Sequence, residues 1–270
     1  MELQGQPTNG TLTVIQTQTL KEIGGWPTVS ITEDAQLGIR LLEENKTISY
    51  VSKVIGKGLA PTRPKDLATQ RERWIFGNVQ NLAYLFKSKK LNLKRKIFLA
   101  PQLLSWINFR LPSYLLLLLS TAGMLFSVKD GELIAVTFKL TLLTLLLSHI
   151  SKFLPYWKAE QSLRRAWSGY LVNYAMEFQS AIYWLSYFIN PLKPFKRTSK
   201  SNQGFLPLQD NIYIIVPILI GGIALSFTSF GLWGATLIAY ATFLLYATYA
   251  LNTSAREIHR APHPLEPVTL

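Results

Sequence analysis

The sequence predicts a protein of two parts, an α/β water-soluble region over residues 1–95 and an α-helical membrane region over residues 96–270. Two observations predict this division. Only 16% of the 270 residues are charged and 49% are hydrophobic, whereas about a quarter of the residues in an ordinary soluble domain are charged. The apolar residues are also unevenly spread, because they dominate residues 97–255 while residues 1–95 have a mixed composition.

The formal net charge of +13 is compatible with a nucleic-acid surface or with the basic flanks of membrane segments. The basic residues cluster beside apolar runs, in residues 87–96, 164–165, 193–200 and 256–260. Such clusters at the ends of hydrophobic spans are typical of cytoplasmic loops. The sequence therefore favours a multi-pass membrane protein with no nucleic-acid partner. The absence of cysteine excludes disulfide and thiolate chemistry.

The water-soluble region contains signals for short elements. Thr32 precedes Glu33 and Asp34, and a hydroxyl followed by carboxylates is typical of a helix start, because both stabilise the positive end of a helix. We expect this helix to continue to Glu44 and a short strand to follow over 47–55. An apolar stripe at helical spacing then predicts a helix over about 67–86.

Four segments are candidates to cross a bilayer, which requires about 20 mostly apolar residues; they are residues 106–127, 132–154, 211–229 and 231–251. A fifth segment, 165–190, has Glu177 near its middle, and a carboxylate there costs about 2.5–3.5 kcal/mol. If it crossed, the basic residues of 193–200 would lie outside the cell. We therefore predict an interfacial amphipathic or re-entrant helix over 165–190, which places every basic cluster and residues 1–95 in the cytoplasm.

Three stretches contain the residues that chemistry could use. The first holds Glu33 and Asp34, for which a helix cap is the simpler interpretation. The second holds Gln70, Arg73 and Trp74, which share one face of the expected helix. A guanidinium suits a diphosphate because it can donate two parallel hydrogen bonds, and an indole can stack on a sugar ring, although an Arg–Trp pair is also common as a membrane anchor. The third is the basic loop 194–203, whose simpler interpretation is a cytoplasmic flank.

Together these stretches resemble the C-terminal half of the processive family-2 glycosyltransferases, the cellulose synthase-like membrane polysaccharide synthases. The resemblance rests on T-E-D at residues 32–34, Q-x-x-R-W at residues 70–74 and the loop that joins them. Residues 195–200 resemble the F-x-V-T-x-K gating loop of the family, with Arg197 at the position where Val is common. Residues 9–11 resemble a segment beside the acceptor site.

The resemblance implies an inverting hexosyltransferase in which residues 1–95 form the acceptor side of a GT-A domain. Asp34 corresponds to the catalytic base. The implied substrate-binding residues are Thr32, Glu33, Gln70, Arg73, Trp74 and Trp26, and the implied gating residues are Phe195, Thr198 and Lys200. The expected partners are a nucleotide-sugar donor, UDP-glucose foremost, a growing polysaccharide, and the lipid bilayer of a bacterial inner membrane.

The nucleotide-binding half of this family carries D-x-D carboxylates for Mg²⁺ or Mn²⁺, and no D-x-D occurs in this chain. The metal ligands are therefore expected outside it, on a separate N-terminal half. We expect the chain to be a fragment, a split subunit or a truncated gene product that is inactive alone. The alternative is a non-catalytic membrane pore or assembly subunit derived from such a synthase. A small transporter would leave the T-E-D and Q-x-x-R-W pair unexplained.

Overall fold

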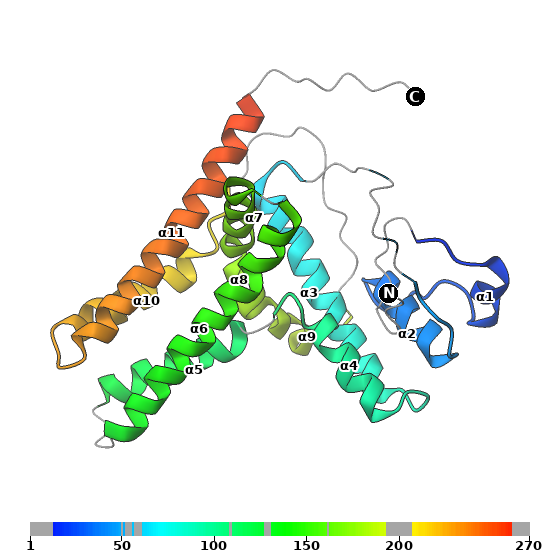
Figure 1. The fold of residues 1–270 in the computed structure, drawn as a ribbon, viewed down its shortest axis with the longest axis horizontal. Coiled ribbons are helices and arrows are strands. Elements are labelled where there is room, and N and C mark those ends of the chain that lie inside the picture. The colour runs from blue at the N-terminus through cyan, green and yellow to red at the C-terminus, as the bar shows by residue number, and fades with distance from the viewer. Residues whose placement is uncertain are drawn as a thin grey trace. The chain divides into compact units, whose positions relative to one another are not determined.

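The computed structural model describes residues 13–49, 51, 56, 61–107, 110–126, 131–160, 162–192 and 207–260. Every regular element in these residues is a helix (Figure 1). The strand expected over 47–55 is not formed by 47–49 or 51, and its remaining residues lie outside the described ones. The α/β part of the predicted fold class is therefore not confirmed.

The backbone packs into two compact units with interleaved boundaries. Unit 1 consists of Met1–Leu59, Gln70–Leu111 and Gln179–Arg197, and unit 2 consists of Ala60–Thr69, Pro112–Phe178 and Thr198–Leu270. Residue 95, where the sequence predicts the boundary between the two parts, lies within helix α4, Leu93–Leu103. The assignment of residues 1–95 to the cytoplasm and 96–270 to the membrane stays a prediction.

Unit 1 begins with α1, Thr17–Glu22, and α2, Glu33–Glu43. The helix start predicted after Thr32 is confirmed. Helix α3 spans Pro64–Lys87 and confirms the helix predicted over 67–86, with a start three residues earlier. Proline suits that first position because its missing N–H would have no partner within the helix.

Helices α2, α3 and α4 share one apolar core in unit 1. The buried residues of this core are Ala35, Ile39 and Leu42 of α2, Leu85 of α3, and Leu91, Leu99 and Leu103 in and before α4. A second cluster forms on another side of α3, where Ile75 and Val79 pack with Ile107 and with Tyr183, Trp184 and Tyr187. Helix α3 thus carries packing partners on two sides, which fixes its orientation within unit 1.

The single interfacial helix predicted over 165–190 is not formed. The segment divides into α7, Leu163–Ala175, α8, Glu177–Ile182, a 3₁₀ turn at Tyr183–Leu185, and α9, Ser186–Ile189. The physical reason is that its two ends pack on different neighbours. Helix α7 packs on α6 and α11 in unit 2, whereas Tyr183 and Tyr187 pack on α3 in unit 1. The interfacial location stays a prediction.

Unit 2 contains the long apolar helices α5, Arg110–Leu125, α6, Gly131–Glu160, α10, Ile212–Ser226, and α11, Gly231–Arg260. Each falls on one of the four predicted spans, and α10 and α11 pack along each other (Figure 1). In the described residues, two stretches are long and apolar enough to cross a membrane, Glu132–Glu160 and Gly231–Ile258. Helix α5 has 16 residues, which is about 24 Å at a rise of about 1.5 Å per residue and shorter than a bilayer core of about 30 Å.

A buried amide organises the polar interior of unit 2. Asn211 Nδ2 donates to the Ala175 carbonyl and to the Thr248 hydroxyl, each at 2.7 Å. Its Oδ1 accepts from the backbone N–H of Phe178 at 3.1 Å. This side chain therefore joins the end of α7, the start of α8 and the middle of α11 at one point.

Candidate acceptor site

The start of α2 is held by a buried side chain of α3. Thr32 immediately precedes α2, yet its side chain does not cap that helix. Instead, Asn81 Nδ2 donates to the carbonyl and to the hydroxyl of Thr32, at 3.0 Å each. Because Thr32 and Asn81 are both buried, these bonds are shielded from water and fix the first turn of α2 against α3.

The residues before Thr32 bind the same part of α3. The Ser30 hydroxyl donates to the Gly77 carbonyl at 3.2 Å, and the backbone N–H of Ile31 donates to Gln80 Oε1 at 3.0 Å. Gln80 Nε2 donates to the Pro191 carbonyl at 2.9 Å. Two separate segments of unit 1, residues 30–32 and Pro191, therefore bind consecutive turns of α3.

Gly77 permits this close approach. A Cβ atom at residue 77 would lie 2.6 Å from Thr32 Cγ2 and 2.9 Å from Thr32 Cβ. Contacts this short do not occur between real side chains, so any larger residue would displace Thr32 or α3. The absence of a side chain at residue 77 thus sets the distance between α2 and α3.

The Q-x-x-R-W motif lies on the same stripe of α3 as this contact. At 3.6 residues per turn, Gln70, Trp74, Gly77 and Asn81 follow one line along the helix, with Arg73 at its edge. Trp74 is about 4.5 Å and Gln70 about 10.5 Å from Gly77 along the axis, at a rise of about 1.5 Å per residue. The start of α2 therefore contacts the face of α3 that carries the Q-x-x-R-W motif, on the C-terminal side of the motif.

The two carboxylates of the T-E-D motif occupy the first turn of α2. Glu33 and Asp34 are the acidic residues of this turn, and both are half-buried. Asp34 Oδ1 accepts from the backbone N–H of Ala35 at 2.8 Å. The bonds of Thr32 to α3 fix the position of this first turn. The Asp34 carboxylate therefore projects from a turn that is held in place.

The indole of Trp74 has an aromatic partner. Its ring stacks on Trp106, with ring centroids 5.3 Å apart and planes inclined by 29°. The guanidinium carbon of Arg71 lies 3.7 Å from the Trp106 ring centroid and 5.1 Å from that of Trp74. A cation over an indole face is attracted to its π-electrons, so Arg71 and Trp106 together orient Trp74.

Of the remaining predicted site residues, the structure describes Trp26. Trp26 is 46% exposed and follows a turn in which Gly24 and Gly25 have φ angles of 85° and 81°. The described contacts do not connect it with the T-E-D or Q-x-x-R-W residues. Phe195, Thr198 and Lys200 of the predicted gating loop lie outside the described residues, as do residues 9–11.

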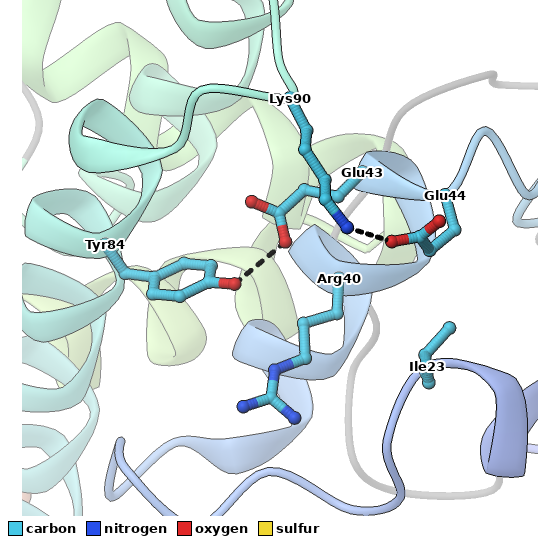
Figure 2. Close-up of a pocket in the computed structure, with 6 residues that line it drawn as sticks. All are labelled: Ile23, Arg40, Glu43, Glu44, Tyr84 and Lys90. Carbon is cyan, nitrogen blue, oxygen red and sulfur yellow. Dashed lines mark hydrogen bonds and ion pairs between the residues drawn. The ribbon is translucent and has the colours of Figure 1, made fainter.

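A second polar region of unit 1 is a cavity of about 290 Å³ lined by Ile23, Arg40, Glu43, Glu44, Tyr84 and Lys90 (Figure 2). The Tyr84 hydroxyl donates to Glu43 Oε2 at 2.8 Å, and the Lys90 ammonium pairs with Glu44. Burial and the hydrogen bond to Glu43 raise the pKa of Tyr84. None of the predicted site residues lines this cavity, and its contacts tie the end of α2 to the end of α3.

The described residues do not form a metal centre. They contain no group of three or more His, Cys, Asp or Glu that could hold a metal ion. Glu33 and Asp34 alone provide only two carboxylates on adjacent positions. The described residues of this site therefore do not fit the divalent metal that the resemblance implies.

Sequence reasoning missed Gly77, Gln80 and Asn81, which hold α2 in place, and Arg71 and Trp106, which orient Trp74. One signal was available. Residues 77 and 81 continue the stripe that begins at Gln70, at intervals of seven and eleven residues. A Gly and an Asn on the same stripe as three candidate site residues indicate a close polar contact rather than an apolar core.

The arrangement of unit 1, with a carboxylate turn fixed against a helix that presents an amide, a guanidinium and an indole, suits a site that binds a sugar and activates its hydroxyl. The chain belongs to the family described as Glycosyl transferase family group 2, whose model matches residues 6–253. It is similar to the cellulose synthase 1 catalytic subunit (UDP-forming) of Komagataeibacter xylinus, with 31% identity over 71 residues. That match covers 26% of this chain and 10% of the relative, so the chain matches about a tenth of the relative's length. No solved structure matches significantly.

Proposed function

We propose that this chain forms the acceptor-binding and channel part of a membrane glycosyltransferase that polymerises sugar from a nucleotide-sugar donor. The observation that carries the proposal is the attachment of Thr32 to Asn81 and Gly77, because it joins the T-E-D turn to the stripe of the Q-x-x-R-W motif. The similarity to the cellulose synthase catalytic subunit, which is a UDP-forming enzyme, supports UDP-glucose as the donor and a β-glycan as the product.

In the proposed reaction, Asp34 acts as a general base on the acceptor sugar. It takes the proton of an acceptor hydroxyl, whose oxygen attacks the anomeric carbon of the donor, and the bond to the nucleoside diphosphate breaks with its electron pair on the departing oxygen. Attack opposite the leaving group inverts the anomeric configuration. The fork of Arg73 suits the diphosphate, while Gln70 and Trp74 bind the acceptor.

The remaining substrate contacts are proposed by resemblance. Thr32 and Glu33 flank the acceptor turn, Trp26 offers an exposed indole to a sugar, and Phe195, Thr198 and Lys200 form a gating loop over the donor. Mg²⁺ or Mn²⁺ would compensate the diphosphate charge, with ligands on a separate N-terminal half that binds the nucleotide. The growing polysaccharide would leave through unit 2 across a bacterial inner membrane, with residues 1–95 in the cytoplasm and α5, α6, α10 and α11 as spans.

The test compares Asp34→Asn with Glu22→Gln in membranes that contain this chain and the donor-binding half, with UDP release and polymer measured after addition of UDP-glucose. Loss of a positioned base should lower the rate by about 10²- to 10⁴-fold. Glu22 is an exposed carboxylate of unit 1 paired with Lys46, and an exposed pair of this kind contributes little, so Glu22→Gln should keep its activity. Near-normal turnover by Asp34→Asn would overturn the assigned base.

The same assay separates the enzyme from its alternative. Membranes with this chain alone should release no UDP above background, and addition of the donor-binding half should restore turnover. If neither preparation releases UDP although the chain is folded and inserted, the result would favour the non-catalytic pore or assembly subunit. Arg73→Lys should also be severely impaired, because an ammonium does not reproduce the planar fork of a guanidinium.

A further inference from the structure

The segment just before α10 binds four helices. The backbone of Leu208 exchanges two hydrogen bonds with the side chain of Asn252 in α11, at 2.8 and 2.9 Å. The buried amide of Asn211 bonds to α7, α8 and α11. Asp210 forms an ion pair with Lys65 in the first turn of α3, with Nζ 2.5 Å from Oδ2. This segment is therefore attached at once to α3, α7, α8 and α11.

Two of these contacts lie close to points where the chain passes from unit 2 to unit 1. Helix α3 passes into unit 1 at Gln70, five residues after Lys65. The chain passes into unit 1 again after Phe178, whose backbone N–H donates to Asn211. The adjacent side chains of Asp210 and Asn211 thus hold both segments before they leave unit 2.

The two segments meet again in unit 1. Tyr183 and Tyr187, which follow α8, pack against Ile75 and Val79 of α3. The Q-x-x-R-W motif therefore lies on α3 between the ion pair of Lys65 and this aromatic packing, or overlaps its edge. The motif begins only about 7.5 Å beyond Lys65 along the helix axis, at a rise of about 1.5 Å per residue.

The position of Lys65 explains why its partner matters. The start of a helix carries a partial positive charge, so a lysine in the first turn is unfavourable unless a carboxylate compensates it. The side chain of Lys65 is 35% exposed and that of Asp210 is 19% exposed, and partly buried pairs are screened less by salt than exposed ones. Loss of the Asp210 carboxylate would leave the ammonium uncompensated and detach the first turn of α3 from the segment before α10.

We propose that Lys65 and Asp210 are positioning residues for sugar transfer. Their ion pair fixes the start of α3 and thereby places the Q-x-x-R-W motif against the acceptor and the diphosphate, an inference that rests on the proposed function of that motif. Neither residue touches a substrate, and both act through α3. A displacement of about 1 Å at the reacting groups can lower a rate about 10²-fold, so the pair should affect kcat more than KM.

Charge exchange tests this role in membranes that contain the chain and the donor-binding half. Lys65→Asp and Asp210→Lys each place like charges together, and each should lower kcat by about 10- to 100-fold. The double variant rebuilds the ion pair with reversed polarity and should recover most of the loss. Lys46→Glu, which reverses one charge of the more exposed pair with Glu22, is the matched control and should keep the wild-type kcat. A double variant as impaired as the single variants would overturn the proposal.

Hydrogen–deuterium exchange of the same variants in detergent requires no activity. The single reversals should speed amide exchange over residues 66–76 of α3, and the double variant should restore it. Asp210→Asn removes the charge without adding repulsion and should act in the same direction, so it keeps the test decisive if a reversal fails to fold.

Unchanged exchange over residues 66–76 in Asp210→Asn and in the folded reversals would overturn the positioning role whatever the activity. Faster exchange in these variants, together with a wild-type preparation that never transfers sugar, would support the attachment of α3 and count against the proposed function. The two failures are therefore distinguishable.

Discussion

Thr32 occupies the space that a side chain on Gly77 would need, with its Cγ2 atom 2.6 Å from the position of that missing Cβ. The two residues are 45 positions apart in the sequence (77 − 32). Their contact brings a motif at a helix start against the helix that carries the second motif. The site of unit 1 therefore depends on a glycine that takes no part in binding or chemistry.

Gly77→Ala should destabilise unit 1 and impair sugar transfer together. The added methyl forces Thr32 away from Asn81, and overpacking of this kind costs about 1–3 kcal/mol. Thermal unfolding of the purified chain in detergent, followed by circular dichroism, measures this loss. Gly123→Ala is the control, because a Cβ at residue 123 of α5 meets nothing within 4 Å. Equal melting temperatures for both variants would contradict the steric role of Gly77.

Trp106→Ala should weaken acceptor binding through Trp74. Stacked aromatic pairs contribute about 0.5–1.5 kcal/mol beyond their buried area, so the KM for an oligosaccharide acceptor should rise by up to about tenfold. The effect on kcat should be smaller, because Trp106 is not placed among the reacting groups, and Trp106→Phe should restore most of the affinity.

A double-mutant cycle tests whether the two indoles act together. If Trp106 acts by orienting Trp74, its replacement should have little further effect once Trp74→Ala is present. Effects on KM that simply add in the double variant would show that the two side chains bind acceptor independently, and would remove the positioning role of Trp106.

Tyr84→Phe should lower the stability of unit 1 by about 1 kcal/mol at neutral pH, since it removes a hydrogen bond to the Glu43 carboxylate. Burial, followed by the bond to Glu43, raises the pKa of Tyr84 above 10.0, so the folded chain holds this proton more tightly than the unfolded chain. The stabilisation is complete below pH 10.0, the ordinary pKa of the group, and is lost as pH rises further.

The measurement is the melting temperature of wild type and Tyr84→Phe at a series of pH values. The difference between them should be constant around neutral pH and shrink above the ordinary tyrosine range. Tyr249→Phe, at an exposed position of α11, should match wild type throughout. If the difference in melting temperature between wild type and Tyr84→Phe grew at alkaline pH, the result would contradict the raised pKa of Tyr84.

The predicted topology can be measured with reporter tags in whole cells. Tags at Lys200 and at the C-terminus should be cytoplasmic, and a tag at Asp130 should be external, because this arrangement keeps every basic cluster inside. Modification by a membrane-impermeant reagent distinguishes the two sides. A tag at Lys200 on the outer side would mean that the 165–190 segment crosses the bilayer.

Local signals in the sequence were sufficient for several elements. The acidic turn after Thr32 predicted the start of α2, and the apolar stripe of residues 67–86 predicted α3, because capping and helical periodicity act within a few residues. Apolar composition likewise located α5, α6, α10 and α11. The combination of the T-E-D and Q-x-x-R-W motifs was enough to suggest the glycosyltransferase family that the match over residues 6–253 then showed.

Other features depended on contacts between distant segments. Asn81 bonds a residue 49 positions away (81 − 32), and no local pattern indicates which of several polar residues on α3 makes that bond. The segment 165–190 has the composition of one helix. Its N-terminal part packs in unit 2 and its C-terminal part packs in unit 1, so it divides into several short helices.

The sequence by itself thus determined the helices α2, α3, α5, α6, α10 and α11 and the choice of candidate catalytic groups, because these follow from neighbouring residues. Only the tertiary structure decided that Gly77 and Asn81 hold the T-E-D turn and that Trp106 and Arg71 orient Trp74. The physical reason is that steric fit and buried hydrogen bonds depend on which surfaces meet, and that is set by packing across the chain rather than along it.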